Sequence, residues 1–147
     1  MVTEPAHLLD VNVLVALSWP QHVHHQRAHS WFAARHSQQW ATTPITEASF
    51  IRISSNTAVI PAAVSVADAV QALVAMRALP GHLFVPDDSS MADPVIDTTR
   101  LVTPRQVTDL HLINLAARNG VVLATLDTAV TTYLTEADRR YVELLSG

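Results

Sequence analysis

The sequence predicts a three-layer α/β/α fold with a mainly parallel central sheet. Short apolar segments that read as buried strands alternate with amphipathic segments that read as helices. This alternation is typical of βαβ units, which place parallel strands between layers of helices. The chain has 147 residues, of which 49% are hydrophobic and 15% are charged. We therefore expect residues 1–147 to form one globular domain with its own core.

The composition excludes several classes of protein. The chain has no cysteine, which rules out disulfides, thiolate nucleophiles and cysteine-based zinc sites. It also has no lysine, so a P-loop or a Schiff-base lysine is excluded. A formal net charge of −4 argues against binding of nucleic acid through bulk positive charge. Because no apolar run is long enough for a membrane span and no signal peptide is recognisable, we expect a cytoplasmic protein.

The first predicted strand, residues 7–11, contains an aspartate where a helix then begins. Asp10 either caps that helix or belongs to a ligand site, because open α/β sheets bind ligands at the carboxyl ends of their strands. Asn12 is equally suited to the cap. A second helix is expected from His22 to His36 and carries several histidines. Only His25 and His29 have the spacing of a helical ligand pair, so structural histidines are favoured over a zinc site.

A short strand, residues 39–42, leads into a helix that runs to about residue 56. Thr43 is its expected cap and Pro44 its first residue. Glu47 lies near the helix start on an apolar face shared with Phe50 and Ile51. A favourable interaction with the helix dipole is one explanation for this carboxylate, and a role in a site is the other.

The middle of the chain offers little chemistry in its sequence. A helix capped by Ser65 ends at Pro80–Gly81 and carries no residue that suggests a reaction. A strand over residues 82–85 follows. The acidic residues after it are expected to be caps and solvated surface: Asp87, Asp88, Asp93 and Asp97.

The helix from Thr103 to Asn119 carries an unusual carboxylate. Thr103 and Gln106 form a capping box, and Pro104 fits the first helical position. Asp109 lies too far into the helix to be its cap, and Leu112, Ile113 and Ala116 share its face. Either a backbone amide satisfies this carboxylate or it belongs to a site, and the helix alone favours neither.

The last part of the chain repeats the pattern seen at Asp10. A strand over residues 121–125 gives way to a helical segment at Asp127, which is again either a cap or a site residue. Residues 131–138 are expected to be helical and residues 141–145 to form an edge strand.

The four acids Asp10, Glu47, Asp109 and Asp127 are all placed at strand ends or near helix starts. In a parallel sheet these positions occupy one edge, so the four side chains can converge. Clustered carboxylates repel one another unless a cation compensates them, and Mg²⁺ and Mn²⁺ prefer oxygen ligands. The sequence therefore predicts a divalent metal site that suits a phosphodiester substrate.

These residues also resemble a known family. Residues 8–14, Thr46–Glu47, residues 107–109 and residues 124–127 look like the motifs of the PIN domain. Within it they are most similar to the VapC toxins of type II toxin–antitoxin systems. The resemblance covers nearly the whole chain. Each motif is weak alone, and the four in this order are fairly specific.

The resemblance implies a metal-dependent endoribonuclease that acts with a metal-activated water. The family's acidic quartet maps onto Asp10, Glu47, Asp109 and Asp127, with Asp10 and Asp109 as the first expected Mg²⁺ ligands. Asn12 and Thr125 match positions that orient ligands or waters. The arginines expected to contact phosphates are Arg52, Arg105 and Arg118. The expected partners are an RNA substrate, a second copy in a homodimer and a small cognate antitoxin.

Three other functions remain open at this point. The chain could be a PIN nuclease that processes RNA without being a toxin. It could be a binding module without activity, in which the four acids are helix caps. A zinc hydrolase based on the histidines is the third alternative.

Overall fold

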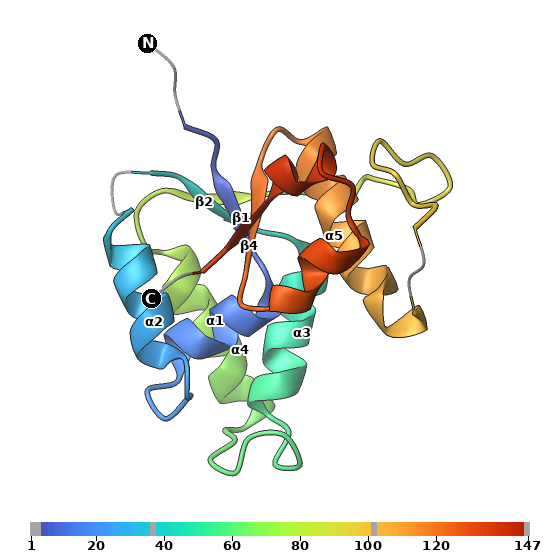
Figure 1. Cartoon of the computed structure of the whole chain (residues 1–147). Coiled ribbons are helices and arrows are strands. Elements are labelled where there is room, and N and C mark those ends of the chain that lie inside the picture. The colour runs from blue at the N-terminus through green and yellow to red at the C-terminus, as the bar shows by residue number, and fades with distance from the viewer. Residues whose placement is uncertain (1–3, 36–37, 101–102, 146–147) are drawn as a thin grey trace.

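The computed structural model describes residues 4–35, 38–100 and 103–145, in which helices and strands alternate (Figure 1). The strands are β1 His7–Leu9, β2 Trp40–Thr42, β3 His82–Phe84, β4 Val122–Thr125 and β5 Val142–Leu144. The α-helices are α1 Val11–Ser18, α2 His25–Ala33, α3 Pro44–Ser54, α4 Val66–Arg77 and α5 Val107–Arg118. Three shorter 3-10 segments are η1 Pro104–Gln106, η2 Thr128–Tyr133 and η3 Asp138–Tyr141.

The described strands form one five-stranded sheet in the order β3-β2-β1-β4-β5, and every pair in it is parallel. The predicted fold class is therefore confirmed. The chain builds the sheet outward from β1 to β3 on one side and then continues at β4 on the other. The strand order thus reverses between β1 and β4. Open α/β sheets bind ligands in the crevice at such a switch point.

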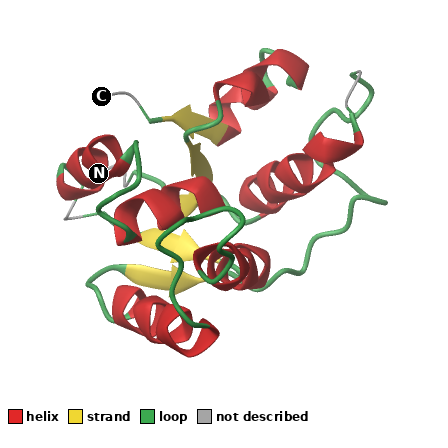
Figure 2. Cartoon of the chain, turned by 90° about the horizontal axis from the view of Figure 1, so that it is seen from below, coloured by secondary structure: helices red, strands yellow, loops and turns green. Residues whose placement is uncertain are grey.

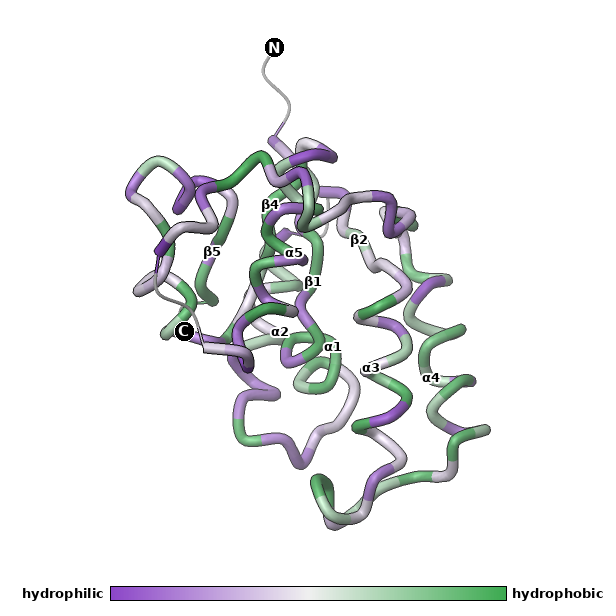
Figure 3. Tube along the Cα trace, turned by 90° about the vertical axis from the view of Figure 1, so that its right-hand side faces the viewer, coloured by the Kyte–Doolittle hydropathy of each residue, from purple (hydrophilic) through white to green (hydrophobic). Residues whose placement is uncertain are grey.

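Two apolar cores cover the two faces of the sheet, and Figure 2 shows the strands between the helices. Leu8, Ala41 and Leu123 face one core together with α5 and η2. Their strand neighbours Leu9 and Ala124 face the other core, which α1, α2, α3 and α4 complete. Alternate residues of a strand point to opposite faces, so both faces are buried. On the second side, α3 and α4 lie side by side (Figure 3).

The helix starts follow the predicted capping residues. Thr43 and Thr46 form a capping box before α3, and the Ser65 hydroxyl accepts a hydrogen bond from the Asp68 amide at 3.0 Å. Thr103 and Gln106 form the predicted capping box, although the first turn is the 3-10 segment η1 and α5 begins only at Val107.

Two predicted helices differ from the structure. The helix expected from His22 begins at His25, because the His24 amide donates to the His22 imidazole and forms a turn there. His36, its expected end, lies outside the described residues. The helix expected over 131–138 is wrong: η2 starts earlier, at Thr128, and an extended Leu134 separates it from η3. The edge strand expected over 141–145 is confirmed as β5.

No helix in the described part of the chain is both long enough and apolar enough to cross a membrane.

Candidate active site

Asp10 lies directly after the central strand β1, at the switch point of the sheet, and is 4% exposed. Its Oδ1 accepts a hydrogen bond from the Val11 amide at 2.7 Å. Asp10 is therefore the cap of α1, which was one of the two roles expected from the sequence. Its Oδ2 accepts a hydrogen bond from the Thr125 hydroxyl at 2.8 Å. Burial raises the pKa of Asp10, and the nearby charge of Asp127 adds to that rise, against the effect of these two hydrogen bonds.

Thr125 and Asn12 join the ends of β1 and β4. The Thr125 Oγ1 donates to Asp10 and accepts from the Asn12 Nδ2 and from the Asp127 amide, both at 3.1 Å. The Asn12 Oδ1 accepts from the Leu126 amide at 3.1 Å. A single buried hydroxyl therefore holds one carboxylate and organises the turn that carries the next. The predicted supporting positions of Asn12 and Thr125 match these contacts.

Asp127 follows β4 and starts η2. Its Oδ1 accepts a hydrogen bond from the Ala129 amide at 3.0 Å, so it is also a cap. Because β1 and β4 are paired neighbours, Asp10 and Asp127 lie at the same edge of the sheet, close enough for the charge of Asp127 to act on Asp10. Capping and membership of a site are therefore compatible for both residues, since each carboxylate keeps lone pairs that the cap does not use.

Asp109, in the first turn of α5, lies close enough to Asp10 and Asp127 for their charges to act on it. Burial raises its pKa to about 6, and the charges of Asp10 and Asp127 contribute to that rise. The ring of Tyr133 lies in the core, and its buried hydroxyl, which makes no hydrogen bond of good geometry within the described residues, lies close enough to Asp109 to oppose the rise in the pKa of that carboxyl. Burial and then the charges of the three aspartates raise the pKa of Tyr133, which keeps the phenol protonated. Three carboxylates from distant segments therefore share one poorly compensated environment.

Glu47 is surrounded differently from the three aspartates. Its Oε2 accepts a hydrogen bond from the Thr42 hydroxyl at 2.5 Å, and its Oε1 lies 3.4 Å from the Arg77 guanidinium. The Thr42 hydroxyl also lies 2.7 Å from the His82 Nε2. Burial, and next the charge of Arg77, lowers the pKa of His82. Glu47 thus lies in the first turn of α3, which follows the adjacent strand β2, within a hydrogen-bonded set of its own.

Two of these contacts were missed by the sequence analysis. The helix after Ser65 was expected to contribute nothing to a site, yet Arg77 in its last turn lies 3.4 Å from Glu47. No periodic signal marks an arginine that bonds across two helices. Tyr133 was missed because its segment was read as an ordinary helix. The sequence offers one signal for Tyr133: it lies on the apolar side of the segment that begins at the acidic cap Asp127.

The three predicted phosphate contacts lie in different surroundings. Arg118 is at the far end of α5 from Asp109 and pairs with Asp93 at 3.2 Å, so it lies apart from the carboxylates. Arg52 and Arg105 are exposed on α3 and η1. A contact of these two with RNA stays a prediction.

The described histidines from His22 to His29 make local contacts or are exposed. The His25 Nδ1 lies 2.7 Å from the Ala16 carbonyl oxygen, which ties α2 to α1. His22 accepts a hydrogen bond from the His24 amide. Among the loop acids, Asp87 pairs with His111 at 2.7 Å and Asp97 bonds Thr99.

No protein-family model matches the sequence. The chain is, however, 50% identical over 139 residues to Ribonuclease VapC38 of Mycobacterium tuberculosis, covering 95% of this chain and 97% of that protein. It is 51% identical over 124 residues to Ribonuclease VapC39 of the same species, covering 84% of this chain and 89% of the other. Ribonuclease VapC44 of that species is 38% identical over 124 residues, or 84% and 87% of the two chains.

The chain belongs to the VapC family of PIN-domain ribonucleases. The family expected from the sequence is thereby confirmed, and the enzymatic interpretation with it. Among solved structures, VapBC2 from Rickettsia felis, crystallised bound to a DNA fragment from its promoter, superposes with a TM-score of 0.62. That match covers 96% of this chain and 99% of the other at 10% identity, so it supports the fold alone.

The residues of this VapC chain fit a small, hard divalent cation. The raised pKa of Asp109, to which the charges of Asp10 and Asp127 contribute, marks a space that lacks positive charge. In the described ranges, no three histidine or acidic side chains are already arranged around one point to hold a metal ion. Waters would therefore supply most ligands, as is usual for Mg²⁺. Asp10, Asp109 and Asp127 are the residues that could hold it.

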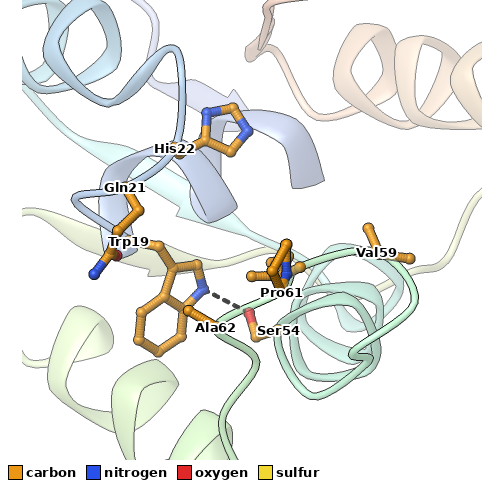
Figure 4. A pocket seen from close by; sticks show the side chains of 8 residues that line it. Trp19, Gln21, His22, Ser54, Val59, Pro61 and Ala62 are labelled. Carbon is orange, nitrogen blue, oxygen red and sulfur yellow. Dashed lines mark hydrogen bonds between the residues drawn. The ribbon is translucent and has the colours of Figure 1, made fainter.

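An open hollow of about 440 Å³ lies away from these carboxylates in the VapC fold (Figure 4). It is lined by Trp19 and His22 after α1, by Ser54 at the end of α3 and by the loop that contains Val59 and Pro61. The Trp19 indole donates to the Ser54 hydroxyl at 2.8 Å. The acids lie at the opposite ends of α1 and α3, so this hollow is separate from the chemistry.

Proposed function

We propose that this VapC chain is a Mg²⁺-dependent endoribonuclease, with Mn²⁺ as an alternative ion, and the toxin of a VapBC-type system. One observation supports the proposal: Asp10, Asp109 and Asp127 lie close enough together, beside the switch point of a parallel sheet, for the charges of Asp10 and Asp127 to help raise the pKa of Asp109 to about 6. Such repulsion, with no arginine paired to these three carboxylates among the described residues, suits a site that functions with a bound divalent ion. The names of the curated VapC relatives support ribonuclease activity.

The residues of the site have distinct roles in this proposal. Asp10 and Asp109 hold the ion, while Asp127 and Glu47 act through waters and position the attacking water. Thr125 and Asn12 keep Asp10 oriented through the hydrogen bonds described above. When bound, the divalent ion supplies the positive charge that a net-acidic protein needs beside a phosphate and lowers the pKa of a water.

The reaction is the hydrolysis of an RNA phosphodiester. The attacking water loses its proton to a nearby carboxylate, its oxygen bonds to phosphorus, and the ester oxygen on the other side leaves. Glu47 is suited to position that water because its two oxygens are held from two sides. Arg52 and Arg105 are the candidates to contact flanking phosphates.

Purified protein incubated with total RNA, with and without Mg²⁺ or Mn²⁺, tests this proposal once the new RNA ends are mapped. Cleavage is expected only with the ion. The Asp10→Asn variant should lose activity by roughly 10³-fold, because a loss of several kcal/mol of metal-dependent stabilisation corresponds to that factor. Asn is also a good helix cap, so α1 should stay folded. Wild-type protein that leaves RNA intact with either ion would support a binding module whose acids are only caps, and an Asp10→Asn variant that cleaves normally would show that Asp10 does not hold the ion.

We also propose an antitoxin partner, a homodimer and a cytoplasmic location, as the family resemblance implies. The solved structure named above is itself a VapBC assembly, which supports a protein partner for the toxin. A small open reading frame beside this one, whose product co-purifies with the chain and abolishes cleavage, is the expected result. An RNA-processing PIN nuclease would have no such neighbour. Light scattering after size-exclusion chromatography measures the oligomeric state.

A further inference from the structure

The carboxylate of Glu47 is held more tightly than those of the three aspartates, and the residues that hold it come from three other elements. Thr42 ends β2, His82 begins β3 and Arg77 lies in the last turn of α4. Both oxygens of Glu47 are engaged, Oε2 by Thr42 at 2.5 Å and Oε1 by Arg77 at 3.4 Å. A side chain with three rotatable torsions is thereby restricted to one orientation.

The direction of the hydrogen bonds follows from chemistry. An ionised carboxylate only accepts, so the single proton of the Thr42 hydroxyl is donated to Glu47. The same hydroxyl then has to accept from His82, whose Nε2 lies 2.7 Å away and therefore carries the proton. The chain of donors runs from the His82 Nε2–H to the Thr42 hydroxyl and on to the Glu47 Oε2. Such a series polarises each bond and strengthens it.

The core holds Thr42 and His82, the two donors in this hydrogen-bonded series, in place. Thr42 is 0% exposed. The ring of His82 packs edge-on against Trp40 with centroids 4.8 Å apart, and the Trp40 indole donates to the Pro80 carbonyl oxygen at 3.1 Å. Gly81, directly before His82, has φ +85, and a Cβ there would come within 3.0 Å of the Gln38 carbonyl oxygen. The turn that presents His82 is thus specified by the backbone.

The position of this hydrogen-bonded series in the sheet relates it to the acidic residues. β2 pairs with β1, so Thr42 lies beside the strand that ends at Asp10. The Glu47 carboxylate, which Thr42 contacts, therefore lies at the same carboxyl edge of the sheet as Asp10. A polar chain that served stability alone would have no need of a carboxylate at its outer end, where Glu47 is 13% exposed.

We propose that Thr42 and His82 are positioning residues for RNA cleavage, acting through Glu47, which they hold in the orientation used to place the attacking water. This inference rests on the proposed nuclease function. It concerns the transition state rather than the binding of RNA, so it affects kcat and leaves KM nearly unchanged. Loss of a partner that orients a reactive group typically costs about 10-fold to 100-fold.

The first test compares Thr42→Val with Thr42→Ser in steady-state cleavage of an end-labelled RNA that spans a mapped cleavage site. Valine keeps the shape and removes the hydroxyl, while serine keeps the hydroxyl and removes a methyl group. We expect kcat to fall by about 10-fold to 100-fold in Thr42→Val and to be largely retained in Thr42→Ser. Thr57→Val, an exposed threonine in the loop after α3, is the matched control.

The second test uses His82, which lies at the sheet edge and tolerates substitution better than a core residue. The amide of Gln can donate from the position of the imidazole Nε2, so His82→Gln should retain more activity than His82→Leu. If Thr42→Val does not fold, this pair still decides the question. Thermal unfolding of each metal-free variant gives a readout that is independent of activity.

The third test is a double-mutant cycle. Thr42→Val added to Glu47→Gln should cost little beyond Glu47→Gln alone, because the hydroxyl acts only through that carboxylate. Additive losses, or activities that simply follow melting temperature, would overturn the inference and leave the nuclease proposal intact. Equal activity of Thr42→Val and wild type would do the same. If wild-type protein cleaves no RNA while Asp10→Asn behaves identically, the nuclease proposal fails and takes this inference with it.

Discussion

Asp109 and Glu47 look alike in the sequence, each a carboxylate near a helix start on an otherwise apolar face, yet the structure surrounds them in opposite ways. Asp109 faces two further aspartates and a tyrosine hydroxyl without a good partner, and its pKa is raised to about 6. Glu47 receives hydrogen bonds from a threonine and an arginine. One region is left short of positive charge and the other is already supplied with donors.

This difference indicates that the carboxylates at one edge of the sheet have two separate roles. Groups that must receive an ion have to keep lone pairs and tolerate repulsion while the ion is absent, which costs stability in the metal-free protein. A group that positions a water benefits from a fixed orientation. Asp10, Asp109 and Asp127 fit the first requirement, and Glu47, held through Thr42 and His82, fits the second.

Ion binding should show the largest difference between the two regions. At Mg²⁺ or Mn²⁺ concentrations about a hundredfold above Kd, the wild-type protein should gain about 2.7 kcal/mol of stability. Asp109→Asn should lose most of this gain, and Glu47→Gln should keep most of it. Thermal unfolding over a series of ion concentrations measures both. If Glu47→Gln loses as much as Asp109→Asn, the two regions share one ligand set and the comparison breaks down.

Removing the charge of Asp109 and removing that of Glu47 should also change the stability of the metal-free protein in opposite directions. Because the folded-state pKa of Asp109 is raised from 3.8 to about 6, its contribution to stability is complete below pH 3.8 and is lost as pH rises through about 6. Asp109→Asn should therefore stabilise the protein at pH 7.5, by about 1 kcal/mol after allowance for the partial exposure of the group. Urea unfolding should show no gain at pH 3.5.

Glu47→Gln is the counterpart in that experiment, and Glu136→Gln, an exposed carboxylate, is the control. Glu47→Gln should not stabilise the protein at pH 7.5, since it weakens bonds that the folded state makes. A gain equal to that of Asp109→Asn would show that Glu47 is also repelled by the cluster.

The fold and the proximity of Asp10, Asp109 and Asp127 could be predicted because local signals and sheet geometry agree there. Asp10 and Asp127 each follow a buried apolar strand, and Asp109 interrupts an apolar helix face. In a parallel sheet these positions meet at one edge whatever the details of packing. The helix caps at Thr43, Ser65 and Thr103 follow from residue type alone.

The surroundings of Glu47 could not be predicted in the same way. Its partners Thr42 and Arg77, and His82 behind Thr42, come together only through the lateral order of β2 and β3 and the packing of α4 on α3. Neither has a periodic signature in the sequence. The unpartnered hydroxyl of Tyr133 is likewise visible only once its ring is placed in the core.

The smallest expected effect on stability is that of replacing Arg77. It sharpens the comparison because it separates the two donors to Glu47, Thr42 and Arg77. The Arg77 side chain is 42% exposed and its nitrogen lies 3.4 Å from the Glu47 oxygen, so Arg77→Gln should cost no more than about 0.5 kcal/mol. Screening by salt should reduce that cost further. Urea unfolding at low and high salt, with exposed Arg52→Gln as the control, measures it. A loss of more than about 2 kcal/mol that persists at high salt would reveal a desolvated ion pair, and Glu47 would then owe its orientation to charge rather than to Thr42.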